Sequence, residues 1–142
     1  MTTMFQNCNE LEYIDLSSFN TSKLTDISYM FNECLKLKEI KGINNFITIN
    51  VIYMNSMYQC CKELVNLDLC NFNTSKVTDM SFMFNGCLKL KEIKGINNFN
   101  TINVTTMRAM FQNCNELEYL NLTNFKLLKL LICLICLINV IN

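Results

Sequence analysis

The sequence predicts an α/β fold: a right-handed leucine-rich-repeat solenoid of about five units, with parallel strands on one side and short helices on the other. One cysteine recurs at separations of 26, 27, 26 and 27 residues, at Cys8, Cys34, Cys61, Cys87 and Cys114. A methionine precedes each of these cysteines by four residues. Because elements this short cannot bury their apolar faces alone, neighbouring units must stack on one another.

Each unit begins with a strand and continues into a helix. The pattern Leu-x-x-Ile/Leu-x-Leu-x-x-Phe, first seen at residues 11–19, predicts a short strand and a turn. The strands should begin near Leu11, Leu37, Leu64, Leu90 and Leu117. Apolar residues then follow at three- and four-residue spacing, as from Leu24 to Cys34, which is typical of one buried face of a helix carrying a Met-Phe pair.

Two kinds of unit alternate, so the true period is 53 residues. The segment FQNCNELEY at residues 5–13 is repeated identically at 111–119, and residues 35–46 recur at 88–99. The second kind contains Gly42 or Gly95 and one additional residue, which predicts a bulge or a wider turn after the strand.

The repeat array covers residues 1–125, and an apolar tail without the repeat covers residues 126–142. Its uninterrupted apolar run at 130–138 is far shorter than the roughly 20 residues of a membrane-spanning helix. We interpret the tail as a frameshifted repeat, because deleting one base from a plausible repeat coding sequence reproduces residues 125–142.

Composition excludes several classes of function. The 142 residues include 12 Lys and Arg against 12 Asp and Glu, and there is no His. A balanced charge gives no electrostatic signature of a nucleic-acid partner. Without histidine the commonest general base and metal ligand is missing, so we predict no enzyme activity and no catalytic, cofactor-binding or metal-binding residue.

Repeat positions should form columns along the stacked units. One column alternates in charge, and we interpret it as control of register and solubility: Glu10, Lys36, Glu63, Lys89 and Glu116. A second charged column runs Asp15, Lys41, Asp68, Lys94 and Asn121. A threonine column is interpreted as turn chemistry, with an exposed hydroxyl array contacting a glycan or ice as the alternative: Thr21, Thr48, Thr74 and Thr101.

The candidate partner-contact residues lie on the outward side of the predicted strands. They are Tyr13, Glu39, Asn66, Glu92 and Tyr119. Exposed tyrosines among polar neighbours suit recognition of a protein or a glycan, although ordinary cross-strand packing is the alternative interpretation.

Residues 67–87, LDLCNFNTSKVTDMSFMFNGC, resemble the repeat of BspA-like leucine-rich-repeat surface proteins, including the mycoplasma domain of unknown function. The resemblance covers residues 1–125 and implies a cell-surface or secreted, adhesin-like interaction role with no enzymatic activity.

Two other functions stay open at this point. One is a truncated, non-functional fragment of a longer array, since the chain starts inside a repeat without a visible signal peptide. This start also predicts end-to-end self-association through uncapped repeats. The other is a thiol-based redox protein using the cysteines outside the main column, Cys60, Cys70, Cys133 and Cys136.

Overall fold

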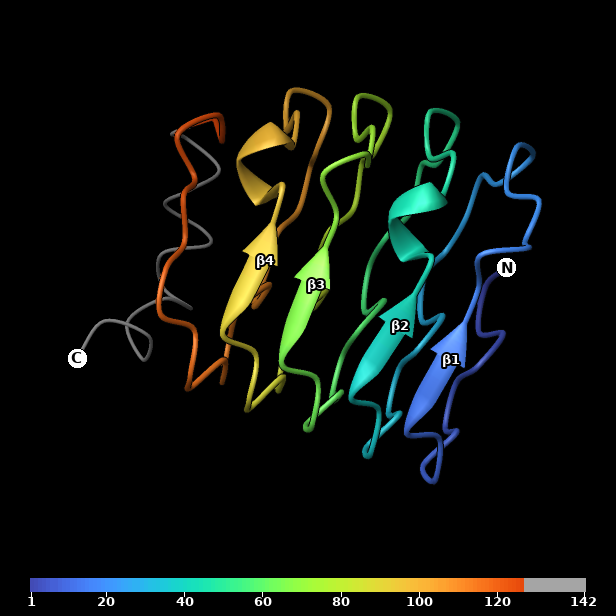
Figure 1. Ribbon diagram of the computed structural model, residues 1–142. Helices are drawn as coiled ribbons and strands as arrows, with labels where there is room; N and C mark the ends of the chain where they lie inside the picture. The colour runs from blue at the N-terminus through green and yellow to red at the C-terminus, as the bar shows by residue number, and fades with distance from the viewer. Residues whose placement is uncertain (127–142) are drawn as a thin grey trace.

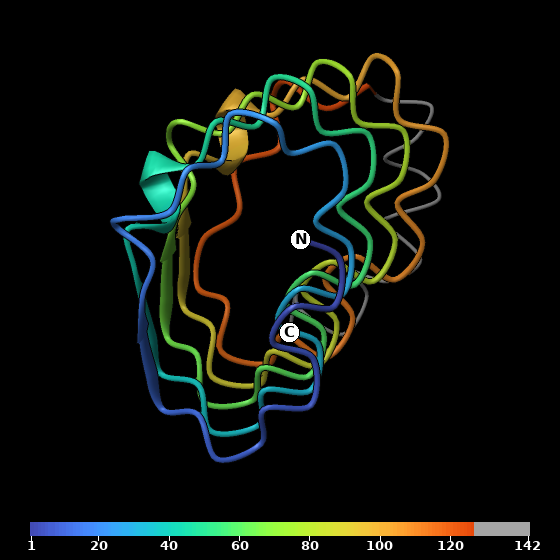
Figure 2. The same ribbon diagram turned by 90° about the vertical axis from the view of Figure 1, so that its right-hand side faces the viewer.

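The chain winds into successive coils that stack on one another, as Figures 1 and 2 show for a computed structural model that describes residues 1–126. The coils carry four strands, β1 (Tyr13–Asp15), β2 (Glu39–Lys41), β3 (Asn66–Asp68) and β4 (Glu92–Lys94). Two 3-10 helices, η1 (Ile43–Asn45) and η2 (Ile96–Asn98), follow β2 and β4. Figure 2 shows the strands together on one side of the stack. The frameshift interpretation and the Cys133 and Cys136 hypothesis concern residues outside this range.

The strands pair in parallel, as a leucine-rich-repeat-like fold requires. β1 pairs with β2 and β3 with β4, but β2 and β3 belong to separate sheets. Each strand begins two residues later than the sequence predicted. The fifth strand, expected near Leu117, is absent from the described residues. There the Glu118 N–H donates to the Lys91 carbonyl at 3.3 Å, a long bond that does not continue into a ladder of strand length.

The predicted short helices are wrong, because residues 1–126 contain no α-helix. Where the helix was expected, consecutive tight turns alternate between two hydrogen-bonding directions. The Tyr29 and Phe31 N–H groups donate to the Asn55 and Met57 carbonyls of the next coil, at 3.0 and 2.9 Å. The alternate N–H groups donate locally, that of Met30 to the Ile27 carbonyl at 3.4 Å and that of Asn32 to the Tyr29 carbonyl at 3.1 Å. In an α-helix every N–H donates to the carbonyl four residues earlier in the same helix. Here hydrogen bonds between stacked coils take the place of half of those bonds.

Left-handed residues make this chain of turns possible. Tyr29 and Glu33 have φ of 57° and 59°, and the same pair of positions is left-handed in the other coils. Apolar side chains spaced by three and four residues still point inward, with Met30 and Phe31 fully buried. The apolar spacing therefore could not distinguish these turns from a helix.

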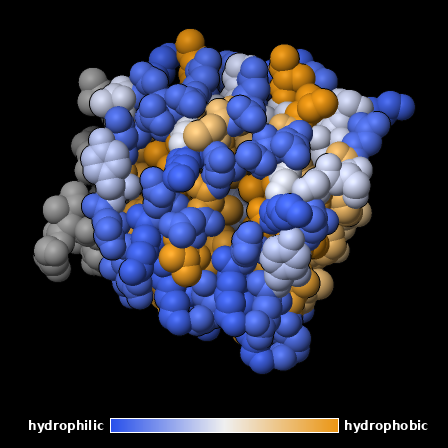
Figure 3. Space-filling view, viewed as in Figure 1, coloured by the Kyte–Doolittle hydropathy of each residue, from blue (hydrophilic) through white to orange (hydrophobic). Residues whose placement is uncertain are grey.

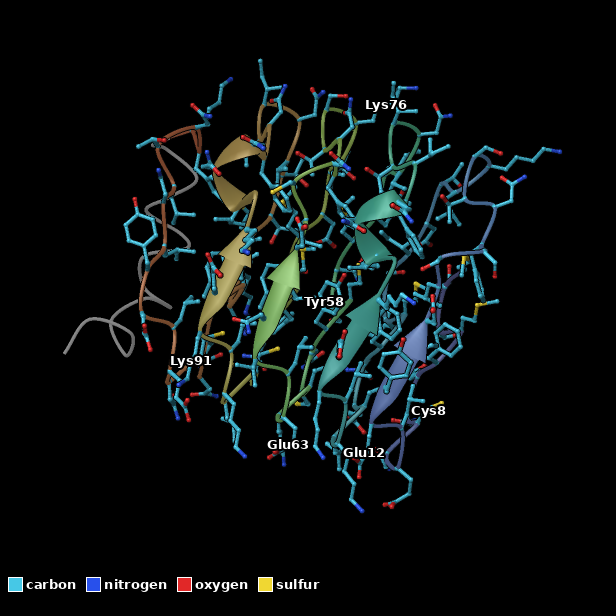
Figure 4. The ribbon with its side chains drawn as sticks, in the orientation of Figure 1. Cys8, Glu12, Tyr58, Glu63, Lys76 and Lys91 are labelled. Carbon is cyan, nitrogen blue, oxygen red and sulfur yellow. The ribbon has the colours of Figure 1, made fainter. Side chains whose placement is uncertain are left out.

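Aromatic rings form one continuous column through the interior. Neighbouring ring centroids lie 5.4 to 5.7 Å apart with planes within 9° of parallel, in the order Phe5, Phe31, Tyr58, Phe84 and Phe111. Tyr58 replaces phenylalanine in the middle, and its buried hydroxyl has no hydrogen-bond partner. Figure 4 labels Tyr58 at the centre of the stack. The column thus contains one polar atom whose desolvation is uncompensated.

The threonine column is buried, which contradicts an exposed hydroxyl array. Thr48 and Thr74 are each 2% exposed. The Thr48 Oγ1 accepts the Asn73 N–H at 2.7 Å and donates to the Asn73 carbonyl at 3.1 Å, and Thr74 bonds Asn100 in the same way. These threonines fasten one coil to the next. The bonds cross between coils, whereas the predicted turn chemistry was local to each unit.

Candidate functional site

The strand side of the stack carries all five candidate partner-contact residues, and each of them is exposed. In the parallel register Tyr13 faces Glu39, and Asn66 faces Glu92. Tyr119 follows in the next coil with 72% of its surface exposed. Figure 3 shows this side as largely hydrophilic, with apolar patches set between the polar side chains. Exposed polar side chains over an apolar floor give the surface the character of a binding face.

Two hollows open on this face at equivalent positions of the 53-residue period. The first has a volume of about 320 Å³ and lies between β2, with the start of η1, and β3; its lining includes Glu39, Lys41, Asn44, Asn66, Asp68 and Lys94. The second has a volume of about 270 Å³ and lies beside β4, Gly95 and the start of η2. Its lining is Glu92, Ile93, Lys94, Gly95, Ile96, Asn97, Tyr119 and Asn121. Both volumes are near the lower end of small-ligand sites, about 300 Å³.

The longer repeat unit explains the position of the hollows. Gly42 has φ of 78°, and a Cβ built on it would lie 2.5 Å from the Ser17 backbone nitrogen. Only glycine therefore allows this coil to approach its predecessor so closely. The additional residue is accommodated in η1 directly afterwards, and the next strand, β3, starts a new sheet. The sequence predicted the wider turn at Gly42 and Gly95 but not the hollow beside it.

Opposite charges surround the first hollow. Lys41 forms an ion pair of 2.8 Å with Asp15, which lies outside the hollow. The Asp68 carboxylate accepts the Cys70 N–H at 3.1 Å and the Asn44 side-chain amide at 3.4 Å. The Cys70 N–H is the main reason that the pKa of Asp68 lies below its usual range, with a smaller effect from Lys94. Asp68 is thus an ionised acceptor at neutral pH.

The floor of the first hollow is apolar. Ile40, Ile43 and Leu67 line it, and each is at most 7% exposed. These side chains belong to the core, which continues beneath the sheet break. A ligand in the hollow would meet apolar atoms below and polar groups at the rim.

The second hollow has the same lining from its strand and 3-10 helix as the first, but it differs in the residues that the next coil contributes. Tyr119 stands where the first hollow has Asn66, and Asn121 stands where it has Asp68. The exchange removes one carboxylate and adds an aromatic ring. Lys94 lines both hollows and therefore connects them.

Ion pairs join neighbouring coils beside the strand side. Lys36 contacts Glu10 at 2.6 Å, and Lys89 contacts Glu63 at 2.7 Å, as the alternating charge column predicts. A neighbouring column adds the pair of Lys38 with Glu12 at 2.7 Å. Figure 4 labels Glu12, Glu63 and Lys91 along one edge of the strand side. These groups are substantially exposed, so each pair contributes little to stability and mainly fixes the register.

The structure divides the predicted contact residues into two groups and leaves one outside. Glu39 and Asn66 share the first hollow, and Glu92 and Tyr119 share the second, whereas Tyr13 lines neither. Sequence reasoning missed Asn44 and Asn97, which enter the hollows from the 3-10 helices. The sequence feature that could have identified them is the extra residue of the longer unit, because it places the turn that carries Asn44 or Asn97 on the strand side.

The buried cysteines lack the properties of reactive thiols. Cys61 and Cys87 are fully buried, and burial raises their pKa values well above the usual range. Burial also raises the pKa of Cys34 to about 11 and of Cys114 to about 12. Their Sγ–H groups donate to carbonyls of the preceding coil at 3.0 to 3.2 Å, as Cys34 does to Phe5.

Cys60 and Cys70, the described thiols outside this column, are not activated either. A hydrogen bond to Asp68 raises the pKa of Cys70, and burial raises that of Cys60. Reactive cysteines require the opposite shift. Within residues 1–126 no three His, Cys, Asp or Glu side chains are placed to hold a metal ion together. Over the same range no helix has the length and apolar character needed to cross a membrane.

Comparison with known proteins gives a family and several distant structural likenesses. Residues 1–125 match the family described as "Mycoplasma protein of unknown function, DUF285". No curated protein matches the chain.

Among solved structures, the chain is similar to a leucine rich cell surface protein from Faecalibacterium prausnitzii, with 20% identity and a TM-score of 0.49 over 80% of this chain and 33% of that one. It is also similar to a leucine-rich repeat protein from Bacteroides ovatus, with 18% identity and a TM-score of 0.48 over 81% and 32%. A leucine rich repeat protein from T. pallidum matches with 15% identity and a TM-score of 0.37 over 82% and 69%. The chain thus spans about a third of the length of the first two.

Proposed function

Because the chain belongs to the DUF285 family, and because its strand side carries exposed polar residues beside two hollows, we propose that it is a non-catalytic interaction module. In this proposal residues 1–125 form a right-handed solenoid of about five units within an adhesin-like surface protein. Its strand side contacts a protein or a glycan partner through Tyr13, Glu39, Asn66, Glu92 and Tyr119.

One observation carries the proposal: the strand side combines exposed polar residues with two equivalent hollows over an apolar floor. A repeat protein of this kind presents an extended surface and not a single enclosed cleft. Such a surface suits contact with a large partner.

Catalysis has no comparable support. The described thiols whose pKa shifts are resolved hold their protons more tightly than usual, as the burial of Cys61 and Cys87 illustrates. A thiol nucleophile needs a depressed pKa or an adjacent base. The sequence contains no histidine to act as that base.

The main proposal is tested by binding of the full chain to a panel of immobilised extracellular matrix proteins and neutral and charged glycans. The strand-side variant combines Glu39→Ala, Asn66→Ala and Glu92→Ala. A matched control variant combines three exposed residues outside the strands, Lys23→Ala, Tyr53→Ala and Arg108→Ala. The proposal predicts loss of binding in the first variant and retention in the second, with both folded by circular dichroism. Equal loss in both variants, or no binding to any member of the panel, would contradict it.

A further inference from the structure

We propose that the two hollows are consecutive subsites for one neutral, linear oligosaccharide that runs across the strands. This inference rests on the proposed function and narrows the partner of the strand side to one chemical class. Four observations carry it: the spacing of the hollows, the lack of a net positive charge around them, their polar rims over an apolar floor, and the aromatic ring in the second hollow.

The spacing of the hollows requires a ligand with a matching repeat. Glu39, Lys41 and Asn44 of the first hollow correspond to residues exactly one 53-residue period later, so the two hollows are two coils apart. Paired strands are about 4.8 Å apart. Neighbouring rings of the aromatic column, which continues past the break between β2 and β3, are 5.4 to 5.7 Å apart. Two coils therefore place the hollows roughly 10 to 11 Å from each other. A linear β-1,4-linked oligosaccharide turns over at each sugar and presents the same edge at every second one. Its two-sugar repeat has about this length.

An extended peptide does not match the same spacing. Its side chains return to one face every second residue, at about 6.6 Å, or at twice that distance. A polyproline II peptide has a three-residue repeat of about 9.3 Å, but such peptides dock in grooves lined by aromatic residues. The first hollow contains no aromatic residue.

The charges that line the hollows disfavour an anionic ligand. Glu39, Asp68 and Glu92 outnumber Lys41 and Lys94, and Lys94 lines both hollows. Neither hollow therefore offers the net positive field that attracts a sulfated glycan or a nucleic acid.

The rim and the floor fit the two faces of a sugar. Ionised carboxylates such as Glu39 and Asp68 only accept hydrogen bonds, and sugar hydroxyls donate them. Asn44 and Asn66 can both donate and accept, and they lie beside the carboxylates. Beneath them, Ile40 and Leu67 offer an apolar surface to the C–H groups of the ring.

The second hollow adds a stacking surface. Tyr119 is the most exposed of the large hydrophobic residues described, at 72%, and it lines this hollow beside Asn97 and Asn121. An exposed tyrosine presents an apolar ring face and a polar hydroxyl, which suits an amphipathic sugar ring. We therefore expect the second hollow to supply most of the affinity and the first to select ligands long enough to reach it.

The test is a titration of the full chain with defined sugars, monitored by isothermal titration calorimetry and by NMR chemical shifts. The probes are cellotetraose and chitotetraose, their disaccharides, and a heparin tetrasaccharide as the charged comparison. At least one neutral tetrasaccharide should bind one to one, about tenfold or more tightly than its disaccharide, because the second subsite is then occupied intramolecularly.

Variants assign the binding to the hollows. Tyr119→Ala and Asn66→Ala should each lower the affinity for the tetrasaccharide about fivefold or more. Asn66→Ala should leave the affinity for the disaccharide unchanged, because the disaccharide occupies the second hollow. Tyr53→Ala is the matched control, since Tyr53 is an exposed tyrosine that lies outside the strands and lines neither hollow. It should leave both affinities unchanged.

Three results would overturn the inference. They are no binding of either neutral tetrasaccharide at millimolar concentration by chain that is folded by circular dichroism, tighter binding of heparin, or equal weakening of binding by Tyr53→Ala. If a matrix protein binds the strand side while neutral sugars do not, this inference fails and the proposed function stands. If neither class binds there, both fail.

Discussion

Alkaline pH should unfold this protein abruptly, because its stacked thiols are held in their neutral form. Cys34, Cys61, Cys87 and Cys114 are fully buried, and burial raises the pKa of each. In the unfolded chain a cysteine has a pKa of about 8.5. Above that pH the unfolded state releases protons that the folded state retains, so the free energy of unfolding must fall as pH rises.

The magnitude follows from the interval between the two pKa values. At pH 10 an unfolded thiol is about 1.5 pH units above its pKa, and one pKa unit corresponds to about 1.4 kcal/mol, so each buried thiol costs about 2 kcal/mol. Four thiols together cost roughly 8 kcal/mol, which is comparable with the whole stability of a typical domain, about 5 to 15 kcal/mol. We therefore expect unfolding near pH 10.

Urea denaturation between pH 7 and pH 10.5, followed by circular dichroism with a phosphine reductant present, measures this dependence. The free energy of unfolding should be constant up to about pH 8 and then fall steeply. Cys87→Ala removes one of the four thiols and should reduce the slope above pH 9 by about a quarter. A free energy that stays constant between pH 8 and pH 10 would refute the reasoning, because it would mean that the thiols ionise within the fold.

Three further substitutions test individual contacts by urea denaturation. Tyr58→Phe removes the buried hydroxyl that lacks a partner and should stabilise the chain by about 1 kcal/mol; a loss of stability would show that the hydroxyl is hydrogen-bonded. Gly95→Ala should lower the free energy of unfolding by at least about 2 kcal/mol more than Gly86→Ala, which is on the order of the penalty at an overpacked site. Both glycines are left-handed, but only at Gly95 would the added Cβ lie 2.4 Å from the Cys70 Cα. Equal losses of stability would contradict the close approach. Asp68→Lys should lower the free energy of unfolding by about 1 kcal/mol, because residue 68 faces Lys94 in the parallel register. Asp68→Asn keeps an acceptor for the Cys70 N–H and should lower it less. An unchanged denaturation midpoint in Asp68→Lys would mean that the charged column is solvated and unpaired.

Much of the stacking could be predicted from the sequence, because each stacked column is visible as a repeated residue type. The cysteine period located the columns, and the alternation of Glu10 with Lys36 and of Glu63 with Lys89 anticipated ion pairs that the structure contains. Parallel pairing followed from the same period, as β1 with β2 and β3 with β4 show.

The turns that replace the predicted helices could not be recognised in the same way. Met30 and Phe31 point inward in either conformation, so their spacing is the same. What separates the two conformations is the direction of alternate N–H groups, and this depends on the neighbouring coil. The left-handed conformations of Tyr29 and Glu33 could not be predicted from residue type, since neither tyrosine nor glutamate favours positive φ.

Four of the predicted contact residues line the hollows, but the hollows themselves were not predicted. Outward alternation on the strands was sufficient to select Glu39, Asn66, Glu92 and Tyr119. The hollows depend on the break between β2 and β3 and on the 3-10 helix after Gly42, both of which arise from one additional residue in the longer unit. That residue was visible in the sequence, but its effect on the neighbouring coil was not.

The central claim, that the strand side is the contact surface, is tested most directly by mapping backbone amide shifts in a ¹⁵N NMR titration of the full chain with its tightest ligand from the binding panel. Our account predicts that the largest shift changes fall within residues 39–44, 66–68 and 92–97, which line the two hollows. Shift changes concentrated instead in the turns at 28–33, 55–60 and 108–113 would contradict it.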